Sequence, residues 1–226
     1  MTTVETFVAE LEGKNQSSFD RLLAAHRELV QSESLSLSDL MRLEVKTCLE
    51  ALEAAALWLT DTEELPFKVA LAAYCGASAQ RYGLLQSRLA DLNAASPEAA
   101  ALADFDPLCL GYSKLFAFLR SLQTVEERAA AGALTNGAFA LARFEALAAR
   151  AEALGDPETA ALFQGALPAT EQEHVHEGRL ALLGTARTEE SQARARRASF
   201  RTIELLAEVQ EPGFVRKFLS RSHKKA

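Results

Sequence analysis

The sequence predicts an all-α protein organised around a four-helix bundle, and three observations carry this prediction. Apolar residues make up 49% of the 226-residue chain, enough for one domain with a full hydrophobic core. Alanine and leucine dominate these residues while valine and isoleucine are few, which favours helix over strand. Apolar residues also recur at helical spacing through most of the chain.

The first half of the chain predicts an arm followed by a helical hairpin. Residues 1–34 form one or two amphipathic helices with a break at 13–18. Residues 39–60 form the first bundle helix, after several serines that suit an N-cap. Pro66 suits the first turn of the second bundle helix, residues 66–92. The connection between these helices is short, so we expect them to be antiparallel.

A long connection, residues 93–124, separates the second helix from the third and becomes helical at 108–122. A bundle needs such a connection when its second and third helices are not antiparallel neighbours. The third helix, residues 125–154, ends at a Gly-Asp-Pro sequence that stops one helix and starts another. The fourth helix, residues 157–183, contains Pro168, so we expect a kink there.

The C-terminal part of the chain is more basic than the rest. From residue 171 onwards there are 11 Lys and Arg against 8 Asp and Glu, whereas the whole chain has a net charge of −7. A last helix, residues 188–209, carries four outward arginines, namely Arg194, Arg196, Arg197 and Arg201. We therefore divide the chain into an N-terminal arm (1–34), a bundle with an additional C-terminal helix (35–210) and a basic tail (211–226). The acidic balance argues against a nucleic-acid partner.

Cysteine usage and the N-terminal sequence predict a soluble, cytoplasmic protein without a membrane span. The cysteines, Cys48, Cys75 and Cys109, are odd in number and widely spaced, so neither a disulfide framework nor a zinc knuckle is indicated. The N-terminus lacks the basic stretch and apolar run of a secretory signal. No segment approaches 18 uninterrupted apolar residues.

Glu171 and His174 are one helical turn apart in the fourth helix, so a carboxylate and an imidazole can point to one place. Two hairpins joined by a long connection, with Glu-x-x-His in the fourth helix, resemble the ferritin-like superfamily over residues 36–184. The resemblance implies a pair of iron or manganese ions held by a Glu from each of two helices and a Glu-x-x-His from each of the other two.

The rest of that ligand set is missing. Counting from the hairpin turn places residue 79 opposite Glu44. The family has a Glu-x-x-His in the second helix at this level, whereas this sequence has Ala79 and Tyr82 at the Glu and His positions. In the third helix, Gly137 stands where the family has its Glu. The matching ligands are Glu44, Glu171 and His174. A two-metal site typically needs four carboxylates, so these residues can hold one ion at most.

Two further pairs of residues have a structural and a chemical interpretation. Cys48 and Cys75 are equidistant from the hairpin turn, so we expect them to face each other as small buried side chains; a redox-sensing or metal-binding thiol pair is the alternative. Glu173 and His176 form a second Glu-x-x-His on nearly the opposite helix face, where they are solvated or form an outward metal site.

The main functional hypothesis is a ferritin-like bundle that has largely lost its two-metal site and acts without catalysis. It would need no cofactor and would bind a small apolar ligand in the former site, or a protein partner through the basic last helix. One alternative is an iron- or manganese-dependent oxidoreductase acting on oxygen or peroxide, in which Glu44, Glu171 and His174 hold the metal beside Tyr82. Another is a structural subunit of a homodimer.

Overall fold

The computed structural model describes residues 3–14, 16–94 and 105–222, and every regular element in these ranges is a helix, so the predicted all-α class is confirmed. The helices in chain order are α1 (Val4–Lys14), α2 (Gln16–Gln31), α3 (Leu37–Asp61), α4 (Leu65–Ala94), α5 (Lys114–Ser121), α6 (Val125–Arg128), the π-helical η2 (Ala129–Asn136), α7 (Gly137–Ala153), α8 (Pro157–Gln164), α9 (Ala166–Thr185), α10 (Glu189–Gln210) and α11 (Pro212–Ser222). None of them is both long and apolar enough to cross a membrane.

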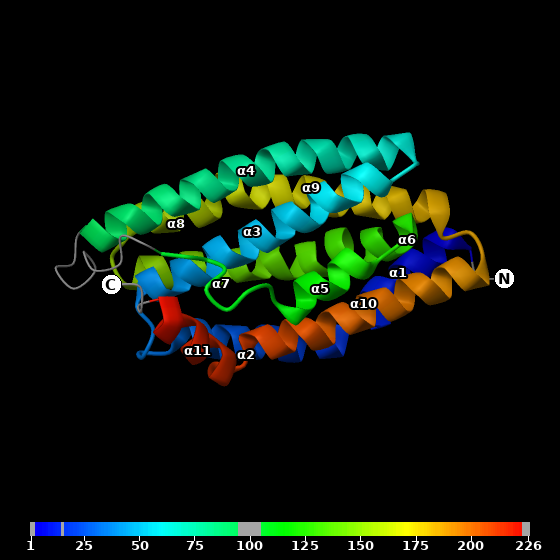
Figure 1. Cartoon of the computed structure of the whole chain (residues 1–226). Helices are drawn as coiled ribbons and strands as arrows, with labels where there is room; N and C mark the ends of the chain where they lie inside the picture. The colour runs from blue at the N-terminus through cyan, green and yellow to red at the C-terminus, as the bar shows by residue number, and fades with distance from the viewer. Residues whose placement is uncertain (1–2, 15, 95–104, 223–226) are drawn as a thin grey trace.

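Two helical hairpins form the centre of the molecule. In the first, α3 packs against α4; in the second, the continuous segment of α6, η2 and α7 packs against α8 and α9. The hairpins meet where α4 contacts α9. In Figure 1, α3 and α9 run one way along the bundle while α4 and α7 run the other way. Because α4 and α7 are parallel, the chain has to return along the bundle between them, as the long connection in the sequence predicts.

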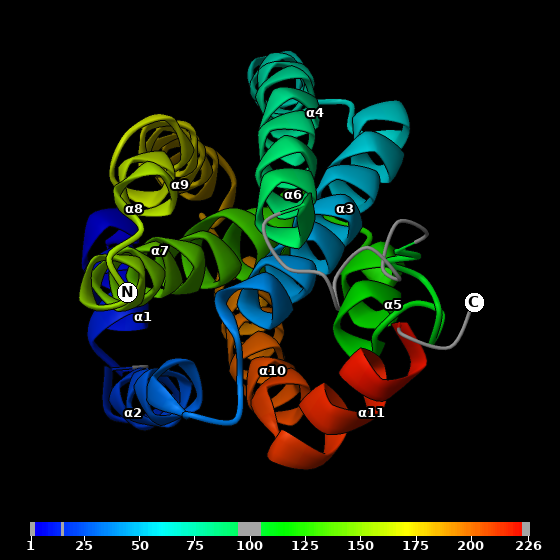
Figure 2. The same cartoon turned by 90° about the vertical axis from the view of Figure 1, so that its left-hand side faces the viewer.

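The terminal helices cover one side of this bundle. Seen end-on, α1, α2, α10 and α11 lie on the side away from α4 (Figure 2). Helix α10 contacts η2, α6, α2 and α5. Phe7 of α1 and Phe218 of α11 are both 0% exposed. The N-terminal arm and the tail helix therefore contribute to the hydrophobic core, and the helix in the tail is longer than the single turn that its apolar spacing suggests.

Local sequence signals account for several helix ends. Ser36 accepts a hydrogen bond from the Asp39 amide while the Asp39 side chain accepts from the Ser36 amide, a capping box that begins α3. Thr188 forms a corresponding capping box with Ser191 at the start of α10. The kink predicted from Pro168 appears as a break between α8 and α9 at Gly165. Pro168 has no amide hydrogen to donate to the carbonyl four residues earlier, so the helix is interrupted there.

The π-helical segment η2 packs closely against α9 and against the Trp58 ring of α3. All eight of its residues are buried, and most of them are small. A Cβ added at Gly132 would lie 2.5 Å from the ring of Trp58 in α3. At the next residue of η2, a Cβ added at Gly178 of α9 would lie 2.3 Å from the Cβ of Ala133. Glycine at these two positions therefore leaves room for the Trp58 ring beside η2 and for the close approach of α9.

Candidate functional site

Two arginine–carboxylate pairs lie at the centre of the bundle, with one member on each of the four helices. Arg81 of α4 donates to Glu171 of α9 at 2.5 Å, and Arg143 of α7 donates to Glu44 of α3 at 2.9 Å. All four side chains are at most 6% exposed. They share one cavity of about 10 Å³ with Asn136, which leaves room for about one water molecule.

An aromatic pair joins α4 and α9 beside Glu171. The rings of Tyr74 and His174 stack with their centroids 3.6 Å apart and their planes at 16°. The Tyr74 hydroxyl donates to Glu171 at 3.4 Å and accepts a hydrogen bond from Arg81 at 3.2 Å. Glu171 and His174 thus both contact Tyr74, and the Glu171 carboxylate accepts hydrogen bonds from Arg81 and Tyr74.

The residues facing Glu44 from α4 differ from those expected. Ala79 is exposed, and Tyr82 is half-buried with its hydroxyl accepting from Gln86, so neither occupies the centre. The expectation was wrong because the distance from the turn gives the level of a residue along α4 but not the direction in which its side chain points. The buried side chains on this stretch of α4 are those one residue earlier, Ser78 and Arg81.

Gly137 lies at the position expected from the sequence. A Cβ there would be 3.1 Å from the Glu171 carboxylate oxygen Oε1 and 2.8 Å from Val175. The neighbouring Asn136 has a buried side-chain oxygen without a hydrogen-bond partner in the described part of the chain. The charged side chain that α7 contributes to the centre is Arg143. The resemblance does not predict it, because the family's ligands at this level are Glu and His.

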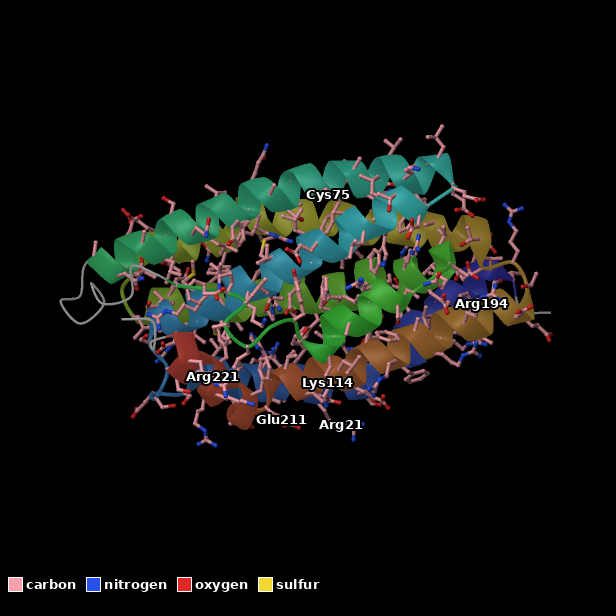
Figure 3. The ribbon with its side chains drawn as sticks, viewed as in Figure 1. Arg21, Cys75, Lys114, Arg194, Glu211 and Arg221 are labelled. Carbon is pink, nitrogen blue, oxygen red and sulfur yellow. The ribbon has the colours of Figure 1, made fainter. Side chains whose placement is uncertain are left out.

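The two cysteines of the hairpin belong to different environments. Cys48 is buried in one hydrophobic cluster and its thiol donates to the Ser78 carbonyl at 3.6 Å. Cys75 is half-buried on α4 at the edge of the other cluster (Figure 3). Both are free thiols. Burial raises the pKa of each thiol, which disfavours the thiolate that redox or metal chemistry requires.

Burial also controls the protonation of the two matched ligands Glu44 and His174. It lowers the pKa of His174 to about 4; nearby Glu171 opposes this shift and Arg81 reinforces it. It raises the pKa of the Glu44 carboxyl, although Arg143 and Arg81 oppose that shift. His174 is therefore a neutral imidazole near pH 7, and its ring nitrogens make no hydrogen bond within the described residues.

The donor set at this centre does not fit a pair of iron or manganese ions. The guanidiniums of Arg81 and Arg143 take the carboxylate oxygens that such ions would need and add two positive charges to the same space. No group of three His, Cys, Asp or Glu side chains within the described ranges is arranged to hold a metal ion. The second Glu-x-x-His, Glu173 and His176, is exposed on α9.

The arginines of α10 are largely paired within the chain. Arg194 bonds Glu126 and Glu190, and Figure 3 shows it on the side of the molecule where α10 begins. Arg196 lies 4.9 Å from the centroid of the Phe7 ring, and Arg201 pairs with Glu204. Pairs of this kind leave fewer free cations for a partner than the sequence suggests.

Comparison of the chain with protein-family models and with curated proteins finds no match.

Proposed function

We propose that this protein is a ferritin-like bundle without a two-metal centre and that it acts by binding rather than by catalysis. Two hairpins with α4 parallel to α7 support the ferritin-like assignment, as do Glu44, Glu171 and His174 on the inner faces of their helices. The observation that carries the proposal is the pairing of Arg81 with Glu171 and of Arg143 with Glu44.

The two guanidiniums neutralise the buried carboxylates electrostatically, as a bound metal ion would. Each brings one positive charge to a buried carboxylate, which would be costly to leave unpaired away from water. A guanidinium has no open coordination position and no accessible redox change, so it can neither activate oxygen nor polarise a substrate as a bound metal does. The centre therefore stabilises the bundle, and ligand contacts have to be made at its edge.

Metal analysis of the full chain tests this proposal. We expect protein purified without chelator to hold well below one iron or manganese per chain, with no difference between the wild type and the double variant Glu171→Ala/His174→Ala. The matched control is Glu173→Ala/His176→Ala, which removes the exposed pair of identical spacing. Stoichiometric iron or manganese that is lost only in the Glu171/His174 variant would overturn the proposal.

A second candidate function, subunit of a homodimer, is favoured by the outer face of α4. Leu65, Val69 and Leu84 on this helix are 68%, 60% and 45% exposed. The exposed residues between them are mostly alanine and glycine, which would let a second helix approach closely. Sedimentation velocity tests this: a dimer of the wild type should dissociate in Leu84→Glu, and a wild-type monomer would remove this candidate.

A further inference from the structure

A groove runs between α4 and α9 on the outer side of the Tyr74–His174 stack. Its volume is about 420 Å³, within the range typical of small-molecule sites. The stacked rings form the floor, and Ala70, Ala73 and Ala77 line the α4 wall. Small side chains on this wall leave the space open, so the groove offers an apolar surface that ends at one buried imidazole.

The α9 wall of the groove is acidic. Glu173 and Glu177 lie one helical turn apart and both line it. The ion pairs within the described ranges include neither of them, and Arg179, the nearest arginine along α9, bonds Glu12 instead. A ligand in the groove would therefore meet two carboxylates that have no cation of their own.

The imidazole of His174 supplies a second, independent indication of a polar ligand group. Its side chain is only 6% exposed and lines the groove, yet its nitrogens have no hydrogen-bond partner in the described part of the chain. These nitrogens are not among the fully buried side-chain atoms without a partner in the described part of the chain, so a ligand in the groove can reach them. A neutral imidazole offers one acceptor nitrogen, which an N–H donor of a ligand would satisfy.

We propose that the groove between α4 and α9 binds a small apolar amine in its ammonium form. The ammonium group would lie between Glu173 and Glu177 and donate to His174, while the apolar body would lie along the alanine wall and the Tyr74 ring. An anion would be repelled by the two carboxylates, and a neutral alcohol would leave them without a counter-charge. This inference rests on the proposed binding function and names its ligand class.

Calorimetric titration with three eight-carbon probes tests the ligand class: octylamine, octanol and octanoate, each below its aggregation concentration, added to the full chain in EDTA. Octylamine should bind at one equivalent and at least about tenfold more tightly than octanol, because a charge-assisted hydrogen bond contributes more than a neutral one. Octanoate should not bind. Equal affinity for the amine and the carboxylate would overturn the inference.

Variants on each wall locate the site. Glu173→Gln/Glu177→Gln should remove the preference for octylamine over octanol, whereas the control Glu28→Gln/Glu33→Gln on exposed α2 and loop positions should keep it. Ala73→Trp fills the groove and should abolish binding of both probes. Its control, Ala79→Trp, places the same side chain on another exposed face of α4 and should leave binding unchanged.

Two results would count against the inference while leaving the proposed function intact. One is octylamine binding that survives Ala73→Trp. The other is a dimer that Ala73→Trp dissociates and octylamine leaves intact, because a second copy of the chain would then be the occupant of the groove. The proposed function would be overturned by a different result, namely stoichiometric metal that is lost in the Glu171→Ala/His174→Ala variant, whatever the titrations show.

Discussion

Gly178 of α9 lies against Ala133 of η2 so closely that a Cβ on the glycine would be 2.3 Å from the alanine Cβ. Gly178→Ala should therefore push the two helices apart and destabilise the protein by about 1–3 kcal/mol, the usual range for overpacking. Urea unfolding measures this. Gly184→Ala in the same helix has open space around it and should be neutral or stabilising by up to about 1 kcal/mol. Equal effects of the two substitutions would contradict the close approach.

The pair formed by Arg81 and Glu171 should behave as a buried ion pair. Arg81→Met leaves the Glu171 carboxylate without its charge partner and should cost about 3–5 kcal/mol. The double variant Arg81→Met/Glu171→Gln removes both charges and should be much less destabilised than the single variant. A double-mutant cycle by urea unfolding measures the coupling. Additive effects would mean that the two side chains do not interact.

Stability should fall as the pH drops from about 6.5 towards 4. Burial lowers the pKa of both His26 and His174 from 6.5 to about 4; Gln210 opposes the shift at His26, and Glu171 opposes the shift at His174. In this interval the unfolded chain takes up protons that the folded chain does not, so each histidine costs up to about 3 kcal/mol at the acidic end.

Substitution separates these histidines from the carboxylates that also titrate. His26→Gln and His174→Gln should each reduce the loss of unfolding free energy between pH 7 and pH 4.5. His176→Gln, an exposed position on α9, should leave the pH profile unchanged. A profile that is the same in all three variants would show that neither buried histidine contributes to it.

The register of α4 can be tested by rebuilding a ligand set. Ser78→Glu/Arg81→His places Glu-x-x-His on the face that meets Glu171, whereas Ala79→Glu/Tyr82→His places it where residue counting from the turn expects it. The first variant should bind Co²⁺ at one equivalent with the visible absorbance of a protein site, and the second should bind at least tenfold more weakly. Tighter Co²⁺ binding by the second variant would show that the residue count from the turn gives the correct register of α4.

The helices were largely predictable because their signals are local. Apolar spacing, the serine cap of α3, the threonine cap of α10 and Pro168 each act within a few residues of the feature that they determine. The site was less predictable, because it depends on the relative rotation of two helices. Successive residues of a helix point about 100° apart, so a register error of one residue predicts Tyr82 at the centre where Arg81 lies.

Arg143 was harder to find than Arg81. In the sequence it lies between alanine and phenylalanine in a helix with several charged residues, and nothing local distinguishes it from Arg150, which is only half-buried in the same helix. Its burial follows from the packing of α2 on α7 and from its ion pair with Glu44 of α3, which are tertiary properties. A useful signal was available: two buried acids on an otherwise apolar bundle require cations from somewhere.

The cations at the centre of this bundle are part of the polypeptide. A guanidinium arrives with every copy of the chain that is translated, in a fixed one-to-one ratio with its carboxylate. If the proposed function holds, we expect such a protein to assemble its interior without an external supply of iron or manganese, so that scarcity of either ion, or a chelating environment, leaves its folding unchanged.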